Sequence, residues 1–272
     1  MKTVSGAEMD EALRGLGVQP GDLVMLHADI ARVGLPEGAL DRESVAGAYL
    51  AALRRAVGPE GTLAALACTE SWVRHRTPFV YETSPSEQGV LAEHLRRQPG
   101  AVRSVHPLFS VCAQGPLAEA LCANASPAAF GHDSPFARLL QLDALILCLG
   151  VDLRAMTFVH HVEQTMGVPY GYTKEWDAPA FRDGRPLPGR YFAFVRYLDC
   201  GVEYDFSRLQ ESLLAAGQAR RVALGYSSAH AVRCRDVFDA AVQGLREDIF
   251  FLLRTPPKRE PWKGPTPGCT TA

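Results

Sequence analysis

The chain has 272 residues, of which 47% are hydrophobic and 21% charged, so it is long enough and apolar enough to bury a substantial core. A formal net charge of −2, with no cluster of Lys and Arg, argues against a nucleic-acid-binding protein. The first residues lack the apolar run of a signal peptide, and no apolar stretch is long enough to span a bilayer. We therefore expect a cytoplasmic protein with no nucleic-acid partner and no membrane partner.

The predicted secondary structure alternates between helices and strands. In chain order, the predicted elements are an amphipathic segment at 9–17, a strand at 23–27, a helix at 41–57, a strand at 61–67, helices at 87–97, 116–123 and 136–141, a strand at 144–150, strands at 193–199 and 221–224, and a helix at 236–253. Strand, helix and strand with short connections are typical of a parallel α/β unit. Because we find no repeat and no linker, we expect one domain at 1–254. The tail at 255–272, with five prolines and few apolar residues, is expected to be disordered.

Residues 69–88 form an unusually long connection between two of these elements. The segment is polar and aromatic and is interrupted by Pro78 and Pro85. Loops of this length are uncommon in compact domains unless they are functional, so we expect a functional loop. Ser86, at its end, is a residue type that caps helices, which predicts a helix that begins at Glu87.

The seven cysteines are dispersed, with no Cys-x-x-Cys pair and no spacing typical of a zinc site. We therefore predict neither a disulfide framework nor a bound metal, and we expect most thiols to be small buried residues. Cys112 and Cys148 lie in apolar runs typical of inert thiols, and a nucleophilic role for either one stays an alternative.

A hydroxyl, an imidazole and a carboxylate recur at three-residue steps just after the strand predicted at 144–150. On a helix, Thr157, His160 and Glu163 would lie on one face. A carboxylate beside an imidazole fixes its tautomer and raises its basicity, as a general base requires. Ligands of open α/β sheets gather beyond strand ends, which favours a functional role. The spacing alone leaves structural histidines and metal ligands open as alternatives.

Several segments match one family in the same order along the chain. They are Leu26-His27-Ala28-Asp29-Ile30 with Gly34, 57–63 (VGPEGTL), 84–89 (SPSEQG), 103–110 (RSVHPLFS), Ser134-Pro135-Phe136, Leu149-Gly150-Val151 and 157–163 (TFVHHVE). Together these segments resemble the aminoglycoside 3-N-acetyltransferase family, the acyl-CoA-dependent group that is distinct from the GNAT fold. The resemblance extends over nearly the whole chain, from about residue 23 to residue 253.

The resemblance implies a single-domain, three-layer αβα sandwich around a central sheet that is mostly parallel or mixed. It also implies direct transfer of an acyl group from acetyl-CoA, or from another acyl-CoA, to a primary amine of a small molecule. In this family the Thr-x-x-His-x-x-Glu motif supplies catalytic groups, which fall here on Thr157, His160 and Glu163. His161 has no matching catalytic position. We expect a monomer or a homodimer.

For the coenzyme, the resemblance points to the turn after the first core strand and to two later segments. The implied coenzyme-binding residues are His27, Ala28, Asp29, Ile30, Ser84, Ser86, Gly89, Arg103 and Ser104. Arg103 and Ser104 would add charge and hydroxyl contacts, whereas Ser84-Pro85-Ser86 is equally typical of an ordinary helix cap. His106 and Lys174 are further active-site candidates, and His106 fits a buried structural histidine equally well.

Two departures from the family pattern affect the expected acceptor. The family commonly has a serine where this chain has Asp29, whose carboxylate would repel phosphates and attract an amine. The near-neutral charge also differs from the acidic cleft that a polycationic aminoglycoside requires. Cations follow the motif, and they form either a solvated face or a site for an anionic acceptor: Lys174, Arg182, Arg185, Arg190 and Arg196. We therefore favour an amino sugar or related biosynthetic amine over a clinical aminoglycoside.

Two other functions stay open at this point. A metal-dependent hydrolase would use His160 and Glu163 together with His106 or His132. A noncatalytic protein with the same fold would bind the coenzyme and transfer no acyl group.

Overall fold

The computed structural model of the chain describes residues 3–187 and 189–260. Within these residues the central sheet has seven strands in the order β13-β14-β8-β2-β4-β7-β6. Their bounds are β2 (Leu23–Ala28), β4 (Thr62–Leu66), β6 (Val102–Arg103), β7 (Val111–Gln114), β8 (Leu145–Leu149), β13 (Ala219–Leu224) and β14 (Ser227–Arg233). The central strands β8, β2 and β4 are parallel, and the outer pairs are antiparallel. The sheet is therefore mixed.

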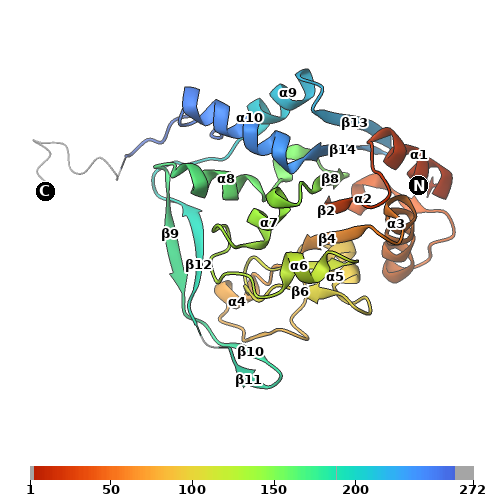
Figure 1. Cartoon of the computed structure of the whole chain (residues 1–272), viewed down its shortest axis with the longest axis horizontal. Helices are drawn as coiled ribbons and strands as arrows, with labels where there is room; N and C mark the ends of the chain where they lie inside the picture. Colours follow the sequence, from red (N-terminus) through yellow and green to blue (C-terminus); the bar gives the residue numbers. More distant parts are fainter. Residues whose placement is uncertain (1–2, 188, 261–272) are drawn as a thin grey trace, which may run out of the picture.

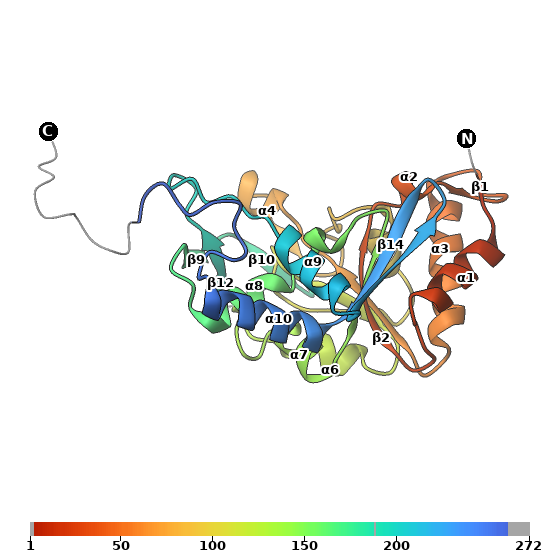
Figure 2. The same cartoon turned by 90° about the horizontal axis from the view of Figure 1, so that it is seen from above.

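Helices cover both faces of this sheet, as Figures 1 and 2 show. One face carries α1 (Gly6–Gly15), α3 (Arg42–Val57) and α5 (Val90–Arg96), and the other carries α6 (Ala118–Cys122), α7 (Pro135–Gln141), α8 (Val159–Met166), α9 (Ser207–Ala215) and α10 (Cys234–Glu247). Alternate residues of β2 explain the two layers, because Leu23 and Met25 enter one apolar cluster while Val24 and Leu26 enter the other. The predicted α/β sandwich is confirmed.

Several short helices and strands lie outside the central sheet. They are β1 (Thr3–Val4), α2 (Ile30–Val33), β3 (Leu35–Pro36), α4 (Ser71–Arg74), β5 (Phe79–Val80), η1 (Leu153–Ala155), β9 (Gly171–Trp176), β10 (Ala180–Arg182), β11 (Arg185–Pro186) and β12 (Tyr191–Arg196). Strands β9 and β12 form a separate antiparallel ribbon at the side of the molecule (Figure 1).

The long connection at 69–88 has secondary structure of its own. It contains α4 and β5, and β5 pairs in parallel with β10. Trp72 and Phe79 form a small apolar cluster with Ala180 and Tyr191, and Trp72 Nε1 donates to the Pro179 carbonyl at 3.0 Å. The connection is therefore an ordered wall rather than an irregular loop.

Helix boundaries differ from the sequence prediction in two places. The helix predicted from residue 87 begins at Val90, and its N-cap is Gly89 with φ +103° rather than Ser86. The helix predicted to end at residue 253 ends at Glu247, because Asp248 has extended backbone and the chain folds back to pack Phe251 on Gly244. Both differences arise from tertiary contacts that periodicity does not register.

Part of the tail that was predicted to be disordered is bonded to the rest of the protein. The Lys258 N–H donates to the Cys200 carbonyl at 2.9 Å, whereas residues 261–272 of the predicted tail lie outside the described residues. In the described ranges, the six cysteines are free and buried. No helix there combines the length and apolarity that a membrane span requires.

Candidate active site

The parallel strands β2, β4 and β8 end at the same edge of the sheet, and the segments that follow them converge there. The Asp29 N–H donates to the Leu149 carbonyl at 2.9 Å, which joins the turn after β2 to the end of β8. Gly150, with φ +72°, passes so close to the Asp29 carbonyl oxygen that a Cβ would overlap it. This edge is where an open α/β sheet usually binds its ligand.

Two adjoining hollows open at this edge. The first, of about 190 Å³, lies between the ends of β2 and β4, helix α5 and the segment after β8; it is lined by Leu26, His27, Ala28, Leu66, Gln88, Leu91, Ala92, Val151, Ala155 and Thr157. The second, of about 320 Å³, reaches toward α4 and is lined by Leu66, Cys68, Glu70, Val73, Arg74, Gln88, Leu108, Phe109 and Thr157. Leu66, Gln88 and Thr157 belong to both walls, so the hollows share a border.

Helix α8 places an imidazole and a carboxylate in direct contact beside this edge. Nδ1 of His160 lies 2.7 Å from Oε2 of Glu163, one helical turn later. The Glu163 side chain is completely buried, whereas that of His160 is 21% exposed. If Nδ1 carries the proton that Glu163 accepts, then Nε2 is left as the basic atom. The prediction that these two residues lie on the same face of a helix is confirmed.

Aromatic rings enclose the His160 imidazole. The ring centroids of Tyr204, Phe130 and Phe206 lie 5.0, 5.4 and 6.1 Å from that of His160. Burial first, and then the negative charge of Glu163, raises the pKa of Tyr204 far above its ordinary value. The Arg196 guanidinium lies 5.1 Å from the Tyr204 ring centroid, on which it stacks. The base candidate is therefore held by its neighbours and screened from bulk water on several sides.

Thr157 is not on helix α8, contrary to the sequence prediction. The helix begins at Val159, and Phe158 is its N-cap. The Thr157 carbonyl accepts the His160 N–H at 3.1 Å, so Thr157 forms the turn that leads into the helix. Its side chain lines the border between the two hollows. Thr157 therefore stays next to His160 but faces the ligand space from a different element.

The turn at 27–30 follows β2 at this edge of the sheet. His27 and Ala28 end β2 and line the first hollow. Asp29 precedes α2, and its Oδ2 lies 3.0 Å from Nε of Arg32. Ile30 begins α2 and is buried. The Asp29 carboxylate therefore has a cationic partner within its own turn.

Ser84, Ser86, Arg103 and Ser104 are all buried and bond within the protein. The Arg103 guanidinium donates to the carbonyls of Ser84 and Ala67 and to the hydroxyls of Thr69 and Ser110. The hydroxyls of Ser84, Ser86 and Ser104 likewise bond to backbone groups. These side chains shape the wall at 69–88 instead of presenting free donors to a phosphate.

Two other candidate residues, His106 and Lys174, lie away from the two hollows. His106 is buried, its Nδ1 accepts the Phe109 N–H at 3.1 Å, and its Nε2 lies 3.1 Å from the Phe192 carbonyl oxygen. Burial lowers the pKa of His106 to about 4. Lys174 is exposed on β9, and its Nζ lies 5.4 Å from the Trp176 ring centroid. Neither side chain lines the two hollows beside α8.

His161 and the thiols have environments unlike that of His160. His161 is buried, and its Nδ1 lies 2.8 Å from the Phe130 carbonyl oxygen. Burial raises the pKa of the Cys112 thiol to about 12 and raises that of Cys148 further. In the described part of the chain, no group of three or more His, Cys, Asp and Glu side chains is arranged to hold a metal ion.

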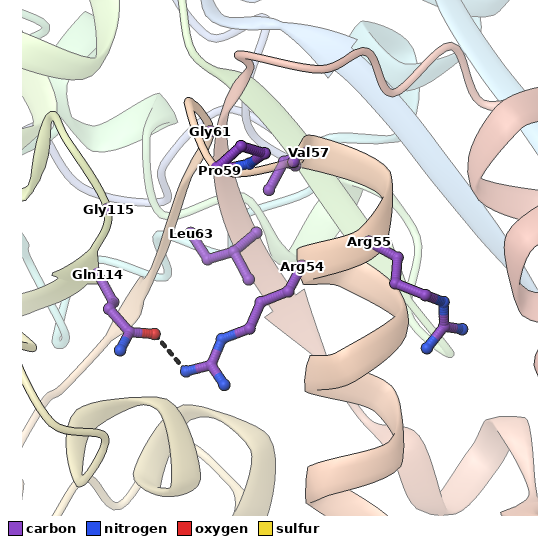
Figure 3. A pocket seen from close by; sticks show the side chains of 9 residues that line it. Arg54, Arg55, Val57, Pro59, Gly61, Leu63, Gln114 and Gly115 are labelled. Atoms are coloured by element: carbon purple, nitrogen blue, oxygen red, sulfur yellow. Dashed lines mark hydrogen bonds between the residues drawn. The ribbon is translucent and has the colours of Figure 1, made fainter.

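A further hollow of about 530 Å³ lies at the opposite edge of the sheet, near the start of β4 (Figure 3). Its wall includes Arg54 and Arg55 of α3, Leu63 of β4 and Gln114 of β7, and Arg54 donates to the Gln114 side chain. It contains no imidazole or carboxylate. This hollow therefore offers no candidate for a general base.

The chain matches known proteins over most of its length. The family model described as aminoglycoside 3-N-acetyltransferase covers residues 25–246. The chain belongs to this family. Aminoglycoside N(3)-acetyltransferase VII of Streptomyces paromomycinus is 32% identical in an alignment that covers 90% of this chain and 93% of the relative. As a member of this family, the chain is an acyl-CoA-dependent N-acyltransferase.

Solved structures of relatives share the fold. AAC-IIIb in a binary complex with CoASH has a TM-score of 0.77 at 27% identity, with 90% of this chain and 97% of that chain covered. A mutant of AAC(3)-IVa in complex with a gentamicin has a TM-score of 0.77 at 27% identity, with 94% of this chain and 93% of that chain covered. Relatives with this fold therefore bind a coenzyme and an aminoglycoside.

The structure adds site residues that the sequence analysis did not single out. Gln88 lines both hollows, and the aromatic rings of Phe130, Tyr204 and Phe206 surround His160. These residues come from segments that lie far apart in the chain, and none has a spacing that marks chemistry. The one usable signal in the sequence was the aromatic character of Phe130, Tyr204 and Phe206, because aromatic side chains often line ligand sites.

Proposed function

We propose that this enzyme transfers an acyl group, in the first place acetyl, from coenzyme A to a primary amine of an aminoglycoside, amino sugar or related small biosynthetic intermediate. His160 is the general base, and Glu163 orients it. The observation that carries the proposal is the 2.7 Å contact between Nδ1 of His160 and Oε2 of a completely buried Glu163. That contact leaves Nε2 as the basic nitrogen of a side chain that is 21% exposed.

The arrangement suits direct attack on a thioester. An amine that attacks the acyl carbonyl carbon must lose a proton, and Nε2 of His160 can accept it. The buried carboxylate of Glu163 then stabilises the imidazolium by its charge. His160 returns the proton to the thiolate of coenzyme A as the carbon–sulfur bond breaks. Thr157, on the border of the two hollows, is placed to bond the thioester oxygen or the departing sulfur.

The two hollows fit a coenzyme arm and an acceptor that meet at Thr157. The wall of the first hollow is uncharged, which suits an acyl group and the neutral arm that carries it. The wall of the second contains Glu70, whose carboxylate is ion-paired with Arg74 at 2.6 Å. The turn at 27–30 and Gly89 supply backbone close to the first hollow, where backbone N–H groups can bind an anion.

The acceptor is the less constrained part of the proposal. A relative of the same fold is bound to a gentamicin, which is a property of that protein. The net charge of this chain is −2, and the carboxylates of Glu70 in the second hollow and of Asp29 in the turn after β2 each have an arginine partner. A polycation gains little from paired carboxylates. We therefore infer an acceptor of lower positive charge than a clinical aminoglycoside.

A thiol-release assay with acetyl-CoA tests the function. The panel contains gentamicin, sisomicin, monoamino sugars, and amino acids and aminophosphonates with free amines. We expect turnover with at least one amine, and the highest kcat/KM with an acceptor that carries one or two amines. Turnover confined to the polycationic drugs would contradict the acceptor class, and silence across the panel with coenzyme binding intact would contradict the function.

A further inference from the structure

His27 is a buried imidazole with an unsatisfied ring nitrogen. The residue is 7% exposed, and its Nε2 is shielded from solvent and has no hydrogen-bond partner in the described part of the chain. The equally buried rings of His106 and His161 each bond to a backbone carbonyl oxygen. An unpaired buried polar group destabilises the fold, because it gives up its bonds to water and gains none in return. Native proteins keep such groups mainly where a function uses them.

The hollow that His27 lines has no charged side chain in its wall. Among its lining residues, only His27, Gln88 and Thr157 have polar side chains, and the others are aliphatic. Charged groups begin in a neighbouring hollow that shares Val151 and Ala155 with it and contains arginines. An uncharged, largely aliphatic space suits an acyl thioester and does not suit a phosphate.

The protonation state of His27 agrees with this assignment. Burial lowers the pKa of His27 to about 4, so the ring is neutral at neutral pH. A neutral imidazole has one N–H donor and carries no charge that would attract a phosphate. Such a donor in a largely aliphatic hollow suits the oxygen of a carbonyl, which gains negative charge only during the reaction.

Thr157 links this hollow to the start of helix α8. Thr157 lines the same hollow as His27, and its carbonyl oxygen accepts the His160 N–H at 3.1 Å. The neighbouring hollow is lined by Tyr204 and Phe206, whose rings pack against His160. A thioester held against His27 and Thr157 would therefore lie beside the turn that leads into the helix of His160.

We propose that His27 is a catalytic residue that donates a ring N–H to the carbonyl oxygen of the acyl thioester. The inference rests on the proposed function. As the amine forms its bond to the carbonyl carbon, the π electrons move to the oxygen, and the His27 N–H stabilises the charge there. The amine proton passes to His160. The carbon–sulfur bond then breaks, its electron pair leaves with sulfur, and sulfur takes the proton from His160.

Isotope-edited infrared spectroscopy of bound acetyl-CoA tests the contact without any acceptor. The acetyl carbonyl is labelled with ¹³C, and its stretching frequency is compared in the wild type, His27→Leu, His27→Gln and His27→Asn. Gln and Asn place an amide N–H near the positions of Nε2 and Nδ1, whereas Leu removes the donor. We expect a lower carbonyl frequency in the wild type than in His27→Leu, and its recovery in one amide variant.

Kinetics and binding give the second readout. Loss of one donor to a developing oxyanion typically lowers kcat about a hundredfold or more, so we expect that drop in His27→Leu and partial recovery in the same amide variant. The Kd for CoASH, which has no acyl carbonyl, should not change. His106→Leu is the structural control: it removes two bonded ring nitrogens and should lower Tm, with the bound carbonyl frequency unchanged.

Some outcomes overturn the inference. Equal carbonyl frequencies in the wild type and His27→Leu, or wild-type kcat in His27→Leu, would show that the ring does not touch the reacting carbonyl. A raised Kd for CoASH with unchanged kcat would place the contact elsewhere on the coenzyme. If His160→Ala retains full turnover while the frequency shift persists, the proposed base is wrong and the role of His27 stands.

Discussion

Nδ1 of His160 and Oε2 of Glu163 lie 2.7 Å apart, and the carboxylate is shielded completely from solvent. A buried carboxylate that bonds one ring nitrogen fixes the direction in which the other nitrogen points. The pair therefore works as a unit, and losing either member should affect the same step.

Removing the base or the charge behind it should lower turnover and leave coenzyme binding intact. We expect His160→Ala and Glu163→Gln each to reduce kcat by about a hundredfold or more, which is the usual size of a lost general base. The double variant should be little worse than either single one. The measurements are thiol release with the best amine of the panel and calorimetry with CoASH.

His132→Ala is the matched control for these variants, because His132 is exposed. It should retain wild-type kcat, whereas a metal-dependent hydrolase that used this histidine would lose activity. Near-wild-type rates in both His160→Ala and Glu163→Gln would mean that another group removes the proton.

The sequence predicted the contact between His160 and Glu163 because its signal is local. His160 and Glu163 lie three residues apart, and an eight-residue helix is enough to bring them together. The strands 23–27, 61–67 and 144–150 were predicted for a similar reason, since both faces of a central strand are buried and its residues form a continuous apolar run. Their observed counterparts are β2, β4 and β8.

The rest of the site depends on contacts between distant segments. Arg103 looked like a phosphate ligand, but carbonyls and hydroxyls from three other segments occupy its donors. Tyr204 meets His160 only because the chain returns to α8 after the β9–β12 ribbon. Hydrophobic periodicity does not indicate which distant segments of a chain come into contact, so these roles could not be predicted from one sequence.

Arg103 should be a main support of the wall at 69–88. The residue is 5% exposed, and its guanidinium bonds to Ala67, Thr69 and Ser84. The guanidinium carbon also lies 4.7 Å from the Phe79 ring centroid. Lysine cannot reproduce this planar fork. We therefore expect Arg103→Lys to lower the free energy of unfolding by about 3 kcal/mol, measured by urea denaturation.

Faster proteolytic cleavage within 69–88 should accompany this loss of stability. Arg185→Lys, at an exposed position of β11, is the control and should change neither property. Unchanged stability in Arg103→Lys would show that the hydrogen bonds of Arg103 are not needed to hold the wall.

The buried thiols should take no part in transfer. Burial raises the pKa of Cys112 to about 12 and that of Cys148 still further, so neither forms the thiolate that attacks a thioester at neutral pH. We expect the protein mixed with acetyl-CoA, without an amine, to show no acetyl adduct by mass spectrometry. Cys148→Ala should keep most of the wild-type kcat. An adduct that forms and then disappears on addition of amine would instead establish a covalent intermediate.

Buried neutral histidines should make the fold sensitive to mild acid. Burial lowers the pKa of both His27 and His106 to about 4, against an ordinary value of 6.5. As the pH falls from 6.5 toward 4, the unfolded chain binds protons that the folded chain does not, so stability is lost in that window and is constant above it for these groups. At about pH 5 the loss is roughly 2 kcal/mol for each histidine.

Urea unfolding at about pH 8 and about pH 5 measures this loss. His106→Gln keeps a donor and an acceptor but cannot titrate, so we expect the difference in stability between the two pH values to shrink by roughly 2 kcal/mol. His132→Gln, at an exposed position, should leave the difference unchanged. If His106→Gln loses as much stability in acid as the wild type does, then folding does not lower the pKa of His106, and the expected acid sensitivity of this residue is wrong.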